Sequence, residues 1–346
     1  MYSYKQIQKG INNPGSIKQE IIWKLKSHWK YHYAVNGAYW TGNVGDRAIA
    51  HSIKNHLSKE GKGVELFPKN IGATRSNVHI LGGGGVLRDC RAAMNESDPE
   101  ILKRRLDWVT SSKKSAILGV GVPGFKTTEA QELIETRLAN VDLITVRDKW
   151  SQNKLRDYFD GEIHTTACPA FLLNDPKSPS TDATGVNFRP WPNYQPDVMS
   201  YHFDFDEGMD IPKSRQIYIK NAQRICGEIE NPVFIPFAKE DEEFAKKYLD
   251  VKILPYKFSV QTTLERISGV NKMVSMRYHS LLFSAITDTP VLAIAYQPKV
   301  SFLAERIGIQ SYEPDKEEFP ITFESPENVN ELKKKAKDNF DLLQDV

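Results

Sequence analysis

The chain has 346 residues, of which 40% are hydrophobic and 26% charged, a composition typical of a globular protein of two domains. Its net charge of +2 is too small to indicate nucleic-acid binding, and its three separated cysteines form no disulfide framework. No stretch approaches the roughly 18 apolar residues of a membrane span, and early lysines argue against a secretory signal. We therefore expect a cytoplasmic protein.

The first 32 residues form a predicted N-terminal extension, because the regular pattern of the chain begins only after them. Residues 17–33 mix apolar, aromatic and basic side chains, among them Trp23, Lys24 and Trp29. Such a segment is typical of a helix on a membrane surface, and equally of a helix docked on its own domain. We favour the docked helix, with peripheral membrane contact through residues 17–33 as the alternative.

From about residue 33 the chain alternates short apolar runs with amphipathic ones, which predicts parallel sheets covered by helices on both faces. The pattern stops at residues 174–184, which are rich in Pro, Ser and Asp and are interpreted as an interdomain linker. We predict Rossmann-like domains over residues 33–175 and 183–325, a functional or capping loop over 190–212, and a final helix over 326–346. The predicted strands are Val78–Leu81, Ala116–Val120, Asp142–Val146, Gly185–Phe188, Pro232–Phe237, Val270–Ser275 and Val291–Ala295, and the predicted helices are Arg47–Leu57, Glu129–Leu138, Lys149–Tyr158, Thr262–Ile267 and Leu281–Ile286.

Three glycine-rich turns occur in the first predicted domain, at residues 42–46, 82–85 and 119–124. The first precedes a helix, whose N-terminal N–H groups favour an anionic or polar ligand, and Asp46 is its predicted cap. Open α/β sheets bind ligands at such strand ends, so a shared crevice is one interpretation, and tight turns for close helix packing are the other. The candidate ligand-contacting residues of these turns are Asn43, Gly45, Gly83, Gly84 and Gly121.

The strongest candidate site lies where a predicted strand ends in Arg277-Tyr278-His279 before an apolar helix. His279 titrates near neutral pH and can act as a general acid or base, and Arg277 can hold an anion beside it. Lys299 follows the next strand, and Arg189 ends the first strand after the linker, so both add positive charge at the same sheet edge.

Two further observations limit the chemistry. At the end of the strand Asp142–Val146 we favour a salt bridge over phosphate binding for Arg147, and Asp148 is a predicted helix cap. The sequence contains no HExxH, no Cys/His cluster with zinc spacing and no Gly-x-Ser-x-Gly elbow, so we expect no metal.

Over roughly residues 33–310 these segments, in this order, resemble the polysaccharide pyruvyl transferase family. The family's Asn-x-Gly-Asp motif is matched by residues 43–46, its Gly-rich strand end by 81–85 and its Arg-Asp-x-x-Ser motif by 147–151. Its Arg-x-His motif is matched by residues 277–279 and its Tyr-x-Pro-Lys motif by 296–299. The family's Asp-Pro-Ala is replaced here by Cys168-Pro169-Ala170, which puts activity or specificity in question if that aspartate is catalytic.

The resemblance implies two Rossmann-like domains facing a cleft, similar to the GT-B glycosyltransferase fold, with the acceptor on the first domain and the donor on the second. It also implies phosphoenolpyruvate as the donor, a sugar of a glycan or lipid-linked glycan as the acceptor, and a pyruvate ketal as the product, in cell-surface polysaccharide biosynthesis without a cofactor.

In this chemistry Arg189, Arg277 and Lys299 are predicted to bind the donor. His279 is predicted to protonate its methylene carbon, with a pKa held up by the donor's negative charge. Asp46 is the candidate base for the sugar hydroxyl. The alternatives are a nucleotide-sugar glycosyltransferase on the same fold and a catalytically degenerate family member that binds glycans.

Overall fold

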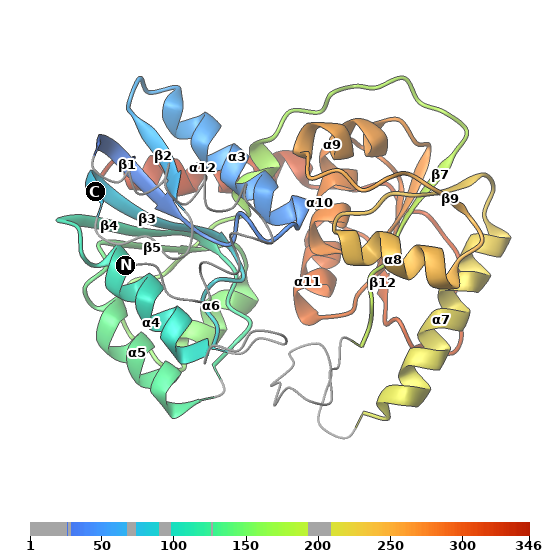
Figure 1. The fold of residues 1–346 in the computed structure, drawn as a ribbon, viewed down its shortest axis with the longest axis horizontal. Helices are drawn as coiled ribbons and strands as arrows, with labels where there is room; N and C mark the ends of the chain where they lie inside the picture. The colour runs from blue at the N-terminus through green and yellow to red at the C-terminus, as the bar shows by residue number, and fades with distance from the viewer. Residues whose placement is uncertain (1–25, 27–28, 68–73, 90–97, 126, 193–208) are drawn as a thin grey trace, which may run out of the picture.

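Two parallel sheets of six strands each form the frame of the protein in a computed structural model, which describes residues 26, 29–67, 74–89, 98–125, 127–192 and 209–346 (Figure 1). The first sheet has the order β2-β1-β3-β4-β5-β6 and the second β12-β11-β10-β7-β8-β9. The first sheet consists of β1 (Lys30–Asn36), β2 (Val64–Phe67), β3 (Arg75–Gly84), β4 (Lys114–Val120), β5 (Leu143–Val146) and β6 (His164–Thr165). The second consists of β7 (Thr184–Asn187), β8 (Pro232–Phe234), β9 (Lys252–Ile253), β10 (Lys272–Ser275), β11 (Val291–Ile294) and β12 (Ser311–Tyr312).

Helices cover these strands because the strands are apolar on both faces. In β4 every residue after Lys114 is buried, which is characteristic of a central parallel strand. The helices connected to the first sheet are α3 (Val44–Ser58), α4 (Asp98–Val109), α5 (Thr128–Leu138), α6 (Lys149–Arg156) and the 3₁₀ helix η1 (Pro169–Leu172). Those connected to the second are α7 (Ile211–Glu228), α8 (Lys239–Tyr248), α9 (Val260–Ser268), α10 (Tyr278–Ile286) and α11 (Pro298–Arg306).

Each sheet has one point at which the strand order reverses, and ligands of open α/β sheets bind beside such points. In the first sheet the reversal lies between β1 and β3, so the turn before α3 and the glycines at the end of β3 come together there. In the second sheet it lies between β7 and β10, whose carboxyl ends carry Arg189 and Arg277. The topology thus brings the predicted site segments to two sheet edges.

The hydrophobic core is divided by the first sheet. One face of that sheet packs against α4 and α5 through a separate cluster that includes Leu106, Ile117 and Ile134. The opposite face packs under α3 and η1, in a cluster that continues into the second half of the chain through residues such as Leu282. Because this core spans both halves, α3 and α10 are held against each other.

The last helix, α12 (Val329–Leu343), follows the second sheet in sequence but packs on η1, β4 and β5 of the first (Figure 1). Its buried Asn339 accepts hydrogen bonds from the hydroxyls of Thr145 and Thr166, at 2.5 and 2.8 Å, and donates one to the carbonyl of Ala167 at 2.9 Å. The C-terminal helix therefore ties the two halves together.

The predicted strands and helices are confirmed, with ends that shift by a few residues. Several elements were not predicted from the sequence, including β2, α4, α7 and α11. The strand β1 begins at Lys30, inside the predicted extension. Most of that extension and the centre of the loop 190–212 lie outside the described residues, so peripheral membrane contact and the capping loop stay predictions. Among the described residues, no helix has both the length and the apolar run that crossing a bilayer requires.

Candidate functional site

The site begins with the turn that leads into α3. The side-chain oxygen of Asn43 accepts a hydrogen bond from the Gly45 N–H at 2.9 Å and caps the helix. The prediction that Asp46 is the cap is therefore wrong, because Asp46 already lies in the first helical turn, where its carboxylate accepts instead from the Thr41 hydroxyl at 3.0 Å. Its carboxylate is thus not engaged in capping.

Gly45 makes the contact that joins the two halves of the site. The N–H of the preceding Val44 donates to the carbonyl of Phe237 at 2.9 Å, which fixes the start of α3 against the second half of the chain. A Cβ atom on Gly45 would lie 2.2 Å from Nδ1 of His279, so only glycine allows this approach. The predicted site segments 43–46 and 277–279 are therefore in direct contact.

His279 is buried in the first turn of α10. Its Nε2 lies 3.7 Å from Sγ of the fully buried Cys168, the position where the family pattern has aspartate. The Tyr278 ring packs edge-on beside the imidazole, and the Arg147 guanidinium lies 4.2 Å from the centre of that ring. Arg147 also fills the space over Gly121, where a Cβ would lie 2.5 Å from its Cζ.

The charges around His279 are predominantly positive. Burial lowers the pKa of His279 well below its usual value, and Arg147, Lys299 and Arg277 lower it further. In the protein alone the imidazole is therefore neutral at neutral pH, and the rise of this pKa on donor binding stays a prediction. The same positive field favours an anion beside the imidazole.

Arg277 is held by two carboxylates. Its Nε and Nη2 donate to the two oxygens of the fully buried Asp241 at 2.7 and 2.6 Å, and Nη2 also donates to Glu240 at 2.5 Å. Asp241 accepts further bonds from the N–H groups of Phe237 and Ala238 at the start of α8. Arg277 therefore fixes the loop before α8, in addition to the donor binding predicted for it.

Arg189 and Lys299 meet at one aromatic ring. The Arg189 guanidinium carbon lies 4.5 Å from the centre of the Tyr296 ring, and Nζ of Lys299 lies 4.9 Å from the same centre. The hydroxyl of the buried Tyr218 donates to the Arg189 carbonyl at 2.6 Å, which holds the segment after β7 in place. The structure thus brings these two predicted donor-binding residues together.

Asp46 belongs to the same charged group. Although its side chain keeps some exposure, loss of water around the carboxyl raises its pKa, while the Thr41 hydroxyl and the cations Arg88, Lys299 and Arg277 oppose this rise. A carboxylate with a raised pKa among cations is suited to proton transfer near neutral pH.

The glycines at the end of β3 have different roles. Gly83 and Gly84 both have positive φ, at 55° and 78°. A Cβ on Gly83 would lie 1.9 Å from Ile49 of α3, so close helix packing explains this residue. A Cβ on Gly84 would lie 3.4 Å from the Asp46 carboxylate, so Gly84 borders the site itself.

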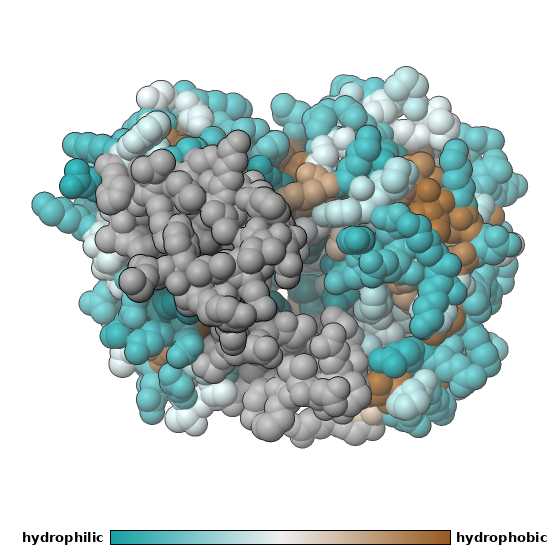
Figure 2. Space-filling view, viewed as in Figure 1, coloured by the Kyte–Doolittle hydropathy of each residue, from teal (hydrophilic) through white to brown (hydrophobic). Residues whose placement is uncertain are grey.

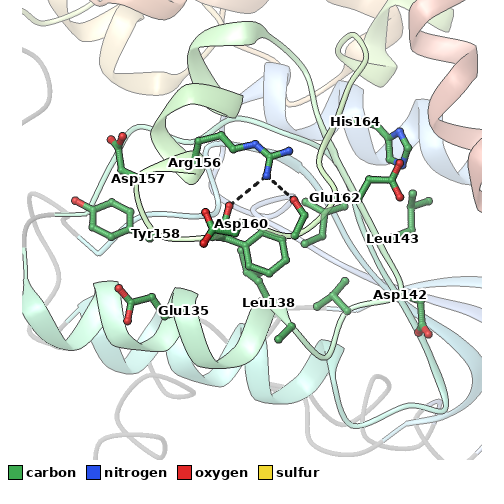
Figure 3. Close-up of a pocket in the computed structure, with 15 residues that line it drawn as sticks. Glu135, Leu138, Asp142, Leu143, Arg156, Asp157, Tyr158, Asp160, Glu162 and His164 are labelled. Carbon is green, nitrogen blue, oxygen red and sulfur yellow. Dashed lines mark hydrogen bonds and ion pairs between the residues drawn. The ribbon is translucent and has the colours of Figure 1, made fainter.

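The hollow in Figure 3, of about 760 Å³, lies at the other end of the first sheet. It is lined by residues at the amino ends of β5 and β6, including Leu143 and His164. Arg156 donates there to the carbonyls of Phe159 and Gly161. None of the predicted site residues lines it, so its size does not make it the candidate site.

Several residues of the site were missed or undervalued in the sequence. Arg147 does form the predicted salt bridge, with Nε 3.1 Å from the Asp148 carboxylate, and Asp148 does cap α6 through the Ser151 N–H. The same guanidinium nevertheless lies beside Tyr278, in the surroundings of His279. Asp241 was missed because no short motif around it marks it as the partner of Arg277.

Comparison with known proteins places this site in a family. The family profile described as Polysaccharide pyruvyl transferase matches residues 43–298, from the cap of α3 to the first turn of α11. The chain belongs to this family. No curated protein matches this chain.

Among solved structures, the UDP-GlcNAc 2-epimerase of Methanocaldococcus jannaschii is 9% identical with a TM-score of 0.51, over 92% of this chain and 100% of that one. An uncharacterized Klebsiella pneumoniae protein is 12% identical with a TM-score of 0.46, over 86% and 97% of the two chains. An alpha-glucosyltransferase solved with UDP-glucose and DNA is 10% identical with a TM-score of 0.46, over 92% and 91%. At these identities the likeness is one of fold, and the predicted class of two Rossmann-like units of GT-B type is confirmed.

Proposed function

We propose that this polysaccharide pyruvyl transferase moves the enolpyruvyl group of phosphoenolpyruvate onto two hydroxyls of a glycan sugar, forming a pyruvate ketal and releasing phosphate. The observation that carries the proposal is the contact of Gly45 with His279, which brings Asp46 of the first half to the cations of the second. An acid, a base and an anion-binding field are thereby assembled in one place.

The cations suit the proposed donor. Phosphoenolpyruvate carries a carboxylate and a phosphate, and both need positive partners in a site with little water. Arg147 and Lys299 both make the field at His279 positive, and Arg189 lies with Lys299 at the Tyr296 ring. Arg277, already paired with carboxylates, contributes less charge and more rigidity.

The proposed reaction proceeds by proton transfer and two additions. His279 protonates the methylene carbon of the donor, and the first sugar hydroxyl attacks the adjacent carbon, with Asp46 accepting its proton. The bond from that carbon to the phosphate oxygen then breaks, and the second hydroxyl attacks the same carbon and gives its proton to the departing phosphate. Phosphoenolpyruvate and a diol thus yield a ketal and inorganic phosphate, without an oxidant, a metal or a cofactor.

The state of His279 adds a requirement to this scheme. Its imidazole is neutral in the protein alone, and burial raises the pKa of the neighbouring Cys168 thiol to about 11, so this neighbour carries no charge at neutral pH. A proton must therefore arrive at His279 together with the donor, whose negative charge raises the histidine pKa. Donor binding is expected to be coupled to proton uptake.

The proposed setting is cell-surface polysaccharide biosynthesis in the cytoplasm, with an acceptor on a glycan or lipid-linked glycan. The family match supports a glycan acceptor. The predicted membrane contact, now limited to the part of residues 17–33 before β1, would fit a lipid-linked acceptor.

The test is phosphate release from phosphoenolpyruvate by the purified protein over a panel of galactosides and N-acetylmannosaminides. Acceptor-dependent release that falls by about 100-fold or more in His279→Ala supports the proposal. Calorimetry of donor binding in buffers of different ionisation enthalpy measures the proton uptake. Unchanged turnover in His279→Ala excludes this residue as the acid. Thermal stabilisation by nucleotide sugars but not by phosphoenolpyruvate points instead to the glycosyltransferase alternative.

A further inference from the structure

A cluster of two aromatic rings and one guanidinium lies beside the candidate site and has no part in the proposed chemistry. The Arg47 guanidinium carbon lies 4.2 Å from the centre of the Trp40 ring and 5.9 Å from the centre of the Phe258 ring. Trp40 belongs to the turn between β1 and α3, and Phe258 to the loop before α9. The cluster therefore contains residues from both halves of the chain.

Both rings are accessible to a ligand. Trp40 is 37% exposed and Phe258 is 38% exposed, and the only other large apolar side chain of the described part of the chain with comparable exposure is Trp29. In Figure 2 apolar surface borders the indentation between the two halves, where α3 and α9 of Figure 1 approach each other. Exposed aromatic groups at such a seam are typical of a binding surface.

The cluster is ordered by contacts of its own. The hydroxyl of Tyr256, two residues before Phe258, donates to the carbonyl of Gly42 at 2.5 Å, which ties the two loops together. The cation–π contact with Arg47 restrains the Trp40 ring. Within the described residues, the buried Nη1 of Arg47 has no hydrogen-bond acceptor, and the guanidinium packs against both rings.

The cluster continues directly into the candidate site. Thr41, which follows Trp40, donates its hydroxyl hydrogen bond to Asp46, the proposed base for the acceptor. Trp40 is therefore linked through its neighbour Thr41 to the group proposed to take the acceptor's hydroxyl proton. A pyranose has a face of C–H groups that packs on an aromatic ring and hydroxyls at its edge that remain free to react.

We infer that Trp40, with Phe258 at its edge, is a subsite for a pyranose ring of the acceptor glycan. The identity of the ligand as an acceptor rests on the proposed function, whereas the sugar-binding surface does not. Trp40 is a substrate-positioning residue in this inference and takes no part in proton transfer.

The test compares Trp40→Leu, Trp40→Phe and Phe258→Leu with Trp29→Leu as the matched control. Trp29 is 64% exposed and precedes β1 at the amino end of the first sheet, away from the strand ends that form the site. Binding of methyl β-galactoside and methyl N-acetyl-β-mannosaminide is followed by saturation-transfer NMR and titration, and phosphoenolpyruvate binding by thermal shift. Trp40→Leu is expected to weaken sugar binding by about tenfold, Trp40→Phe by less, and Trp29→Leu not at all.

Phosphoenolpyruvate binding is expected to be unchanged in Trp40→Leu. Equal sugar binding by Trp40→Leu and the wild type overturns the subsite and leaves the proposed function standing. A wild-type protein that binds neither sugar but turns over another acceptor has the same two consequences. Sugar binding that depends on Trp40, in a protein that does not bind phosphoenolpyruvate, supports the subsite and contradicts the donor. If Trp40→Leu keeps sugar binding but loses UDP binding, the surface binds a nucleotide base. If it keeps sugar binding but loses self-association, the surface binds a second copy of the chain. Either result overturns the sugar subsite.

Discussion

Replacement of Gly45 by alanine tests the contact that assembles the site. The added Cβ would lie 2.2 Å from Nδ1 of His279, and an ordinary contact needs at least 3.4 Å, so the imidazole must retreat by about 1.2 Å. A displacement of about 1 Å in a catalytic group costs on the order of 100-fold in rate. We therefore expect kcat for phosphate release from phosphoenolpyruvate to fall about 100-fold in Gly45→Ala.

Stability is expected to change far less than rate in this variant. Alanine in a helix is favoured over glycine by about 0.5–1 kcal/mol, and the local overlap costs about 1–3 kcal/mol, so the two effects partly cancel. Gly227→Ala is the matched control, because Gly227 lies in α7 with nothing within 4 Å of its added Cβ, and it is expected to keep full activity. Wild-type turnover by a folded Gly45→Ala protein, judged by its thermal melt, would refute the assignment of His279 to the chemistry.

Three further predictions follow from the charges around His279 and Arg277. Cys168→Asp places a carboxylate where Sγ is 3.7 Å from His279 Nε2, so NMR titration should find a histidine pKa higher than that of the wild type. Cys168→Ser adds no charge there and should leave the histidine pKa unchanged. Because the folded-state pKa of His279 is lowered, the unfolded chain takes up this proton first as the pH falls below about 6.5. The free energy of unfolding should then decrease by up to about 1.4 kcal/mol for each pH unit below that value. His279→Gln should remove this contribution of His279 to the pH dependence. Identical pH slopes for the wild type and His279→Gln would contradict the prediction. Asp241→Asn leaves Arg277 without its buried partner and should cost about 3–5 kcal/mol in denaturant unfolding, whereas Glu240→Gln, on a half-exposed partner, should cost about 1 kcal/mol or less.

Much of the fold was accessible from the sequence because strands and helices of this type depend on near neighbours. The continuous apolar run of β4 and the periodicity of α5 identified these elements correctly. The helix α7 was missed where it adjoins the irregular stretch 190–212, and β6, β9 and β12 are only two residues long, too short for a periodic signal.

The capping of α3 shows where a local pattern was insufficient. Asn43 and Asp46 are both good cap residues, and the sequence does not decide which one lies just outside the first helical turn. The structure assigns the cap to Asn43 and leaves the Asp46 carboxylate to the Thr41 hydroxyl and nearby cations. That difference bears on function, because only a carboxylate not used as a cap is suited to accept a proton.

The sequence by itself determined the α/β class, the glycine-rich and basic strand ends, and the family, because these are properties of short segments in a fixed order. Only the tertiary structure decided that Gly45 packs on His279, that Cys168 occupies the position beside its Nε2, and that Arg277 is paired with Asp241. These pairs are far apart in the chain, and their proximity depends on how two sheets and a continuous core pack together. The pKa of His279 follows from the same packing, because burial and charges from several separate elements act on one imidazole.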